Sequence, residues 1–84
     1  MDTLTLDKLD INESGRVARL ASSGAMRRRM IDLGIVEGTL IECVGRSPSG
    51  DPSAYLVRGA VIAIRKRDAR EVLLASGEVS NGTY

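Results

Sequence analysis

The sequence contains no histidine, phenylalanine or tryptophan, and only two tyrosines and one cysteine among its 84 residues. Without histidine, no side chain has an ordinary pKa near neutrality that suits a general base, and the serines stand in turns without an activating partner. The single cysteine, Cys43, cannot form an internal disulfide, and it lacks the further nitrogen or sulfur ligands of a soft metal site. We therefore expect a protein that is not an enzyme, with Cys43 buried and with no evident cofactor; a weak carboxylate site for a divalent transition metal ion stays open.

Charge and hydropathy restrict the partners. Twelve Lys and Arg residues against eleven Asp and Glu give a net charge of +1, so the chain as a whole does not attract nucleic acid or anionic lipid. No apolar run approaches the roughly 18 residues that cross a bilayer. The N-terminus also lacks the basic and apolar segments of a secretory signal. We expect a cytoplasmic protein that reaches a membrane only through a partner.

The apolar pattern predicts an all-β domain over residues 1–75 and a polar, disordered tail over residues 76–84. Met26, Met30 and Leu33 share one face of a helix expected at about 24–33, which Ser22 or Ser23 would cap. Val17 and Arg19 are expected on one face of the first strand. Strands are expected at about 16–21, 38–46, 53–58, 60–65 and 72–74. Five short strands, with one helix between the first and second, predict a small curled antiparallel barrel.

Glycine, aspartate and proline are expected to make the turns between these elements. Gly34 stands where a helix needs a left-handed residue just after its end. Asp51 is expected to cap its own loop, and Pro52 to fix the entry to the next strand. The full set of predicted structural turn residues is Gly15, Gly34, Gly38, Asp51, Pro52 and Gly59.

Two basic runs and the apolar residues beside one of them are candidates for a partner surface. Arginines in the first turns of a helix oppose its macrodipole, which favours an anionic partner such as an acidic protein surface. The candidate residues are Arg27, Arg28, Arg29, Ile31, Ile35, Arg65, Lys66 and Arg67. Other interpretations stay open: a solvated helix face with Arg28 and Asp32 paired, a basic corner turn that serves solubility, or isoleucines that close one end of the barrel.

The order and spacing of the motifs resemble those of the FeoA family. The resemblance covers about residues 4 to 75 and is carried by residues 28–35 with Gly38, then by 50–52, 57–59 and 62–66. It implies an SH3-like barrel. It also implies a small cytoplasmic accessory protein of ferrous iron uptake, which acts by protein–protein interaction with FeoB, a membrane permease that carries a GTPase domain.

The same resemblance leaves an alternative function. This barrel also occurs as the C-terminal domain of iron-dependent repressors, so a regulatory domain or a nucleic-acid-associated barrel is the second hypothesis. Binding of single strands uses aromatic stacking platforms, and the chain offers only Tyr55 and Tyr84. We therefore expect no nucleic acid partner.

Overall fold

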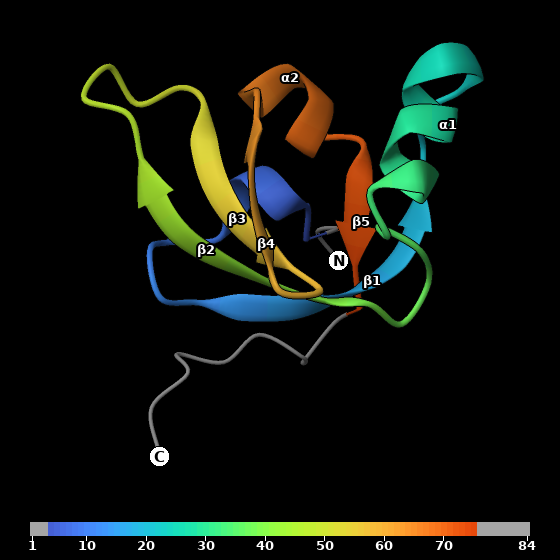
Figure 1. Cartoon of the computed structure of the whole chain (residues 1–84), viewed down its shortest axis with the longest axis horizontal. Coiled ribbons are helices and arrows are strands. Elements are labelled where there is room, and N and C mark those ends of the chain that lie inside the picture. Colours follow the sequence, from blue (N-terminus) through green and yellow to red (C-terminus); the bar gives the residue numbers. More distant parts are fainter. Residues whose placement is uncertain (1–3, 76–84) are drawn as a thin grey trace.

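A curled sheet of five antiparallel strands, in the order β4-β3-β2-β1-β5, forms the protein in a computed structural model that describes residues 4–75 (Figure 1). The elements are a 3-10 turn η1 (Leu6–Lys8), β1 (Ser14–Leu20), α1 (Gly24–Asp32), β2 (Leu40–Arg46), β3 (Ser53–Val57), β4 (Ala60–Ile64), α2 (Lys66–Ala69) and β5 (Val72–Leu74). The prediction of an all-β fold with one short helix between the first two strands is confirmed. The predicted tail at 76–84 lies outside the described residues.

Strand β1 belongs to two ladders. Its first half, Ser14 to Arg16, pairs with β2, and its second half pairs with β5 from Val17 onward. The register shifts between Val17 and Arg19, so one extra residue bulges there. The bulge explains why Val17 is buried while Arg19 is exposed. The prediction that these two side chains share a face is wrong, because it assumed unbroken alternation.

The core is aliphatic, as the shortage of aromatic residues requires. Tyr55 is the largest fully buried side chain, and its hydroxyl donates to the carbonyl oxygen of Leu6 at 3.5 Å. Cys43 is fully buried, as predicted. The other buried apolar residues come from every element: Leu6, Leu9, Val17, Met30, Ile35, Ile41, Val57, Ile64, Ala69, Val72 and Leu74.

Helix α1 ends in a Schellman motif. The N–H of Gly34, at φ +93°, donates to the oxygen of Ile31, and the N–H of Ile35 donates to the oxygen of Met30, both at 2.9 Å. This motif places the residue after the glycine against the last turn of the helix. Ile35 is therefore fully buried beside Met30, and the prediction that it lies on the exposed partner surface is wrong.

The start of α1 differs from its predicted cap. Ser23 occupies the N-cap position, but its side chain makes no capping hydrogen bond. The hydroxyl of the neighbouring Ser22 is buried and has no hydrogen-bond partner.

No helix within residues 4–75 is both long and apolar enough to span a membrane.

Two predicted turn residues have other structural roles. Gly15 lies inside β1, opposite Ile41, where an added Cβ would come within 3.0 Å of Leu74. Close packing against β5 therefore accounts for this glycine, and the predicted turn is wrong. The carboxylate of Asp51 does not cap its own loop; it accepts a hydrogen bond of 2.8 Å from the N–H of Lys66, at the start of α2. Gly34, Gly38 and Gly59 all have positive φ, as turns require.

Because Asp51 accepts a hydrogen bond from α2, we expect substitutions of Asp51 to lower stability by an amount that depends on whether an acceptor oxygen remains. Asp51→Ala leaves the N–H of Lys66 without its acceptor, which should lower the free energy of unfolding by about 1 kcal/mol. Asp51→Asn keeps an oxygen in place and should lose less than half of that. Urea unfolding of the two variants measures the difference. Equal losses would show that the hydrogen bond does not hold α2.

Burial raises the pKa of the Tyr55 hydroxyl above its ordinary value near 10.0. The unfolded chain therefore loses this proton first as the pH rises. The contribution to stability is complete below the unfolded pKa and disappears as the pH rises through the folded one. Urea midpoints should fall more steeply between about pH 9 and about pH 11 for the natural chain than for Tyr55→Phe. Parallel pH profiles would contradict this prediction.

Candidate functional site

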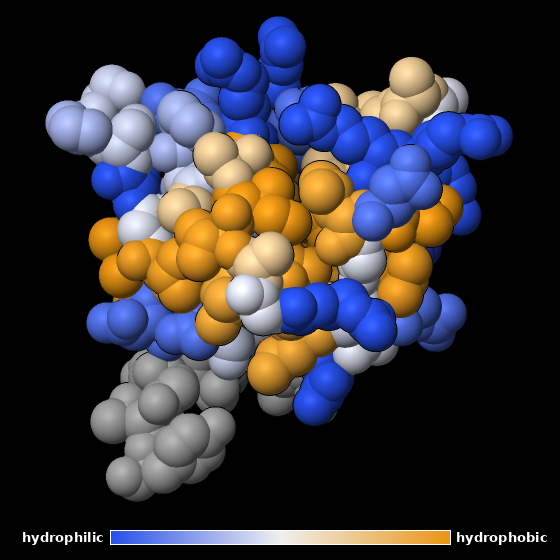
Figure 2. Space-filling model, in the orientation of Figure 1, coloured by the Kyte–Doolittle hydropathy of each residue, from blue (hydrophilic) through white to orange (hydrophobic). Residues whose placement is uncertain are grey.

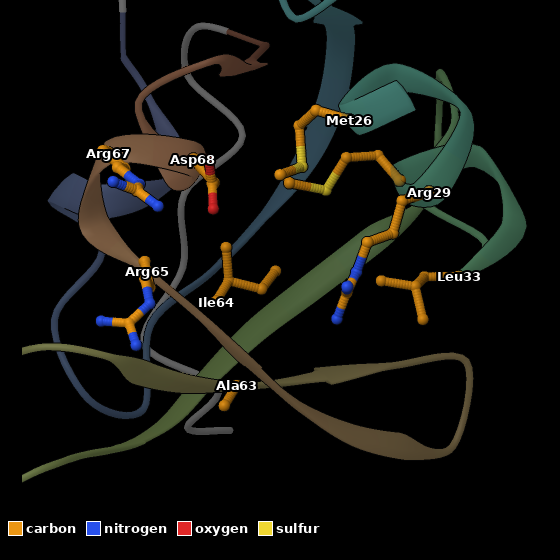
Figure 3. A pocket seen from close by; sticks show the side chains of 9 residues that line it. Met26, Arg29, Leu33, Ala63, Ile64, Arg65, Arg67 and Asp68 are labelled. Atoms are coloured by element: carbon orange, nitrogen blue, oxygen red, sulfur yellow. The ribbon is translucent and has the colours of Figure 1, made fainter. Parts of the chain in front are cut away.

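A groove of about 270 Å³ lies between α1, the end of β4 and α2 (Figure 3). Figure 3 shows Met26, Arg29 and Leu33 reaching from α1 toward Ala63 and Ile64 of β4. The complete lining consists of Met26, Arg29, Met30, Leu33, Ala63, Ile64, Arg65, Arg67 and Asp68. We call this feature the α1–β4 groove.

The floor of the α1–β4 groove is apolar because two patterns in the sequence meet there. Met26, Met30 and Leu33 form the apolar face of α1, of which Met30 is buried and the other two are partly exposed. Strand β4 contains only alanine, valine and isoleucine, and three of its five residues are exposed, with Val61 at 66%. Figure 2 shows the resulting apolar surface in the middle of this face, surrounded by hydrophilic side chains. Apolar area of this kind on a small domain is typical of a contact surface.

The rim of the groove is cationic. Arg29 comes from α1, whereas Arg65 and Arg67 come from the corner that leads into α2, and all three are exposed. Asp68 is the only carboxylate among the lining residues. Two basic runs that lie far apart in the sequence thus contribute to one site. An acidic partner would gain favourable electrostatic contacts there.

The other predicted partner-binding residues lie elsewhere. Arg27, Arg28 and Ile31 line a separate, more open hollow on another side of α1, because neighbouring helix residues point about 100° apart. Arg27 donates to the carbonyl oxygen of Leu20 at 3.3 Å. Ile31 is 42% exposed. Ile35 is in the core and lines neither the α1–β4 groove nor this hollow.

Lys66 lines a third hollow, which is polar. It shares this hollow with Asp7, Arg46, Gly50, Ser53 and Tyr55. The guanidinium of Arg46 already donates from Nε to the hydroxyl of Ser53 at 3.0 Å and from Nη2 to the oxygen of Leu9 at 2.8 Å. These bonds connect β2 to β3 and to the segment after η1. The polar hollow therefore has a structural explanation.

Sequence reasoning missed half of the groove. It placed Met26, Met30 and Leu33 on one face of the helix without proposing that they bind a partner, and it did not select β4 as a binding element. One signal was available: residues 60–64 are five apolar residues without a charge or proline, which is unusual for a strand at the edge of a sheet. The position of β4 at the edge was not visible in the sequence.

The residues that line the groove offer apolar and cationic contacts. Within residues 4–75, no three His, Cys, Asp or Glu side chains are grouped so that they could hold a metal ion. The groove is slightly smaller than the roughly 300–1,000 Å³ of small-molecule sites. Its apolar floor and guanidinium rim suit a few side chains of another polypeptide.

Comparison with known proteins finds relatives of this chain. One curated relative is a fusion of Fe(2+) transport protein A with the Fe(2+) transporter FeoB from Porphyromonas gingivalis, which is 26% identical over 81 residues. That match covers 93% of this chain but only 10% of the fusion protein, so the chain spans a small part of its relative.

Solved structures share the fold. The FeoA-like protein from Clostridium acetobutylicum matches with a TM-score of 0.79 and 32% identity, over 89% of this chain and 87% of that one. FeoA from Stenotrophomonas maltophilia, an SH3 domain protein solved with zinc, matches with a TM-score of 0.86 and 25% identity, over 95% and 99% of the two chains. A manganese-dependent transcriptional repressor matches at 16% identity and a TM-score of 0.77, over 89% of this chain and 41% of that one, which shows a common fold only.

The FeoA domain matches residues 4–76, which is nearly the whole sequence. The SH3-like barrel that the sequence predicted is present in these relatives and in this chain. The chain belongs to the FeoA family.

Proposed function

We propose that the chain is a cytoplasmic accessory protein of ferrous iron transport and that it acts by binding a FeoB-type permease. The main support for this proposal is the fusion relative, in which a segment similar to this chain is joined to the transporter in one polypeptide. Fusion keeps two domains at a high effective concentration, so that a weak contact between them suffices. The same contact between separate chains requires a surface suited to recognition.

The α1–β4 groove supplies such a surface. Apolar side chains at the centre of an interface exclude water, and charges at its rim set orientation and partner choice. In this groove Ile64 lies centrally, with Arg65 on one side of it and Arg29 on the other (Figure 3). The complementary surface on the permease would be apolar and acidic.

Binding, and not catalysis, is the proposed mode of action. The sequence has no histidine, and its one cysteine is buried and inert as a nucleophile. The likeness to the repressor rests on fold alone, so it gives no specific support to a regulatory role. The permease would respond to an occupied or empty docking site, as expected of an accessory protein.

Charge reversal tests this proposal. The purified chain is titrated into the full-length FeoB-type permease of the same organism in detergent, and binding is measured by calorimetry. The double variant Arg29→Glu, Arg65→Glu should weaken binding at least about tenfold, or about 1.4 kcal/mol, because it reverses two charges at the rim. Raised salt should weaken binding of the natural chain as well.

A matched control is available on the same helix. Arg27→Glu, Arg28→Glu changes the charge equally, but it alters the hollow on another side of α1. It should leave the affinity within about twofold of the natural value. An equal loss in both double variants would mean that net charge, and not the groove, determines binding. Absence of any saturable binding by the natural chain would overturn the proposed function.

A further inference from the structure

Strand β4 has an open edge beside the α1–β4 groove. It is the last strand of the sheet, and within residues 4–75 it pairs with β3 alone. Natural proteins commonly protect such edges with a charge, a proline or a bulge within the strand. Strand β4 has none of these over its five residues, and its ladder with β3 is regular.

The hairpin geometry identifies the backbone groups at the open edge. The loop between β3 and β4 has two residues, Arg58 and Gly59, and both have positive φ, as a type I′ turn requires. Val57 and Ala60 are the closing pair. In a two-residue hairpin this pair is of the hydrogen-bonded kind, and hydrogen-bonded and non-hydrogen-bonded pairs then alternate along the ladder. The N–H and C=O groups of Val61 and Ala63 therefore point away from β3, toward the open edge.

We infer that β4 binds an extended, acidic segment of a partner protein by strand addition, with the segment's apolar side chains entering the α1–β4 groove. Main-chain hydrogen bonds to Val61 and Ala63 would supply affinity, and pockets for alternate side chains would supply selectivity. Ala63 takes part in both features, since its backbone lies on the edge and it is one of the residues that line the groove. This inference deepens the proposed function and rests on it for the identity of the partner.

The cations at the two ends of β4 determine which kind of strand can add to its open edge. When two copies of β4 pair antiparallel about Ile62, Arg58 of one copy lies opposite Lys66 of the other, next to Arg65. Both ends of a self-paired edge would thus bring cations together, which is unfavourable. A segment with an apolar centre and carboxylates at its ends would instead pair with Arg58 at one end and with Arg65 at the other. Arg29 and Arg67 add to the same preference.

Hydrogen exchange of the full-length, ¹⁵N-labelled chain tests the inference. The probe is a short blocked peptide of alternating valine and threonine with glutamate at both ends. Binding should slow exchange of the Val61 and Ala63 amides by about tenfold or more, because these N–H groups become hydrogen-bonded. The amides of Ile62 and Ile64, already paired with β3, should change far less. A peptide with lysine ends, and one with alternate backbone nitrogens methylated, should each bind at least about tenfold more weakly.

A proline variant provides the matched test on the protein. Ala63→Pro removes an N–H that faces the open edge and leaves the ladder with β3 in place. Its urea midpoint checks that it folds. We expect Ala63→Pro to lose binding of both the peptide and the permease at least about tenfold.

Four outcomes would overturn the inference. They are protection at other amides only, equal affinity for the methylated peptide, permease binding that Ala63→Pro does not weaken, and self-association of the natural chain through β4 in sedimentation experiments. If the permease fails to bind but the peptide protects Val61 and Ala63, the proposed partner is wrong and strand addition stands. If the permease binds the groove while the peptide leaves these amides unprotected, strand addition is wrong and the proposed function stands.

Discussion

The bend of β1 is the constraint on which the rest of the structure depends. This strand pairs with β2 through its first half and with β5 through its second half, and the bulge between Val17 and Arg19 lies in the β5 ladder. Gly15 permits the bend because Leu74 packs where its side chain would be. Since β1 carries β5 around the core, β4 is left at the opposite edge of the sheet. The open strand and the groove beside it both follow from this arrangement.

The end of α1 fixes the other wall of the groove. Gly34 reverses the chain, and its carbonyl oxygen accepts a hydrogen bond of 2.9 Å from the hydroxyl of Thr39, just before β2. Ile35 then enters the core beside Met30. Because the helix is held at its C-terminal end, its apolar face lies over β4 and Arg29 reaches the rim (Figure 3). The end of α1 at Gly34 thereby does more than reverse the chain, because it orients the helix that forms one wall of the α1–β4 groove.

Local patterns in the sequence were enough to predict the elements, but not how they meet. Apolar periodicity, Gly34 and the turn at Gly59 are short-range signals, and the helix and strands lie close to their predicted positions. The burial of Ile35 could also have been predicted from the sequence, since a Schellman motif pairs that position with Met30. The bulge in β1 and the meeting of Arg29 with Arg65 depend on tertiary contacts between distant segments, which periodicity does not reveal. The same is true of Asp51, whose partner at Lys66 lies beyond two strands.

The distribution of charge around β4 disfavours pairing of its open edge with a second copy of the chain. A lysine within the strand would protect the edge, but it would also fill the groove that Ala63 and Ile64 line. Arginines at the two ends, Arg58 and Arg65, oppose pairing with a second copy and leave the apolar centre free. The same cations attract a segment that carries carboxylates. The same side chains thus disfavour pairing with a second copy of β4 and favour pairing with an acidic segment. An apolar edge can therefore persist on an 84-residue chain with a net charge of only +1.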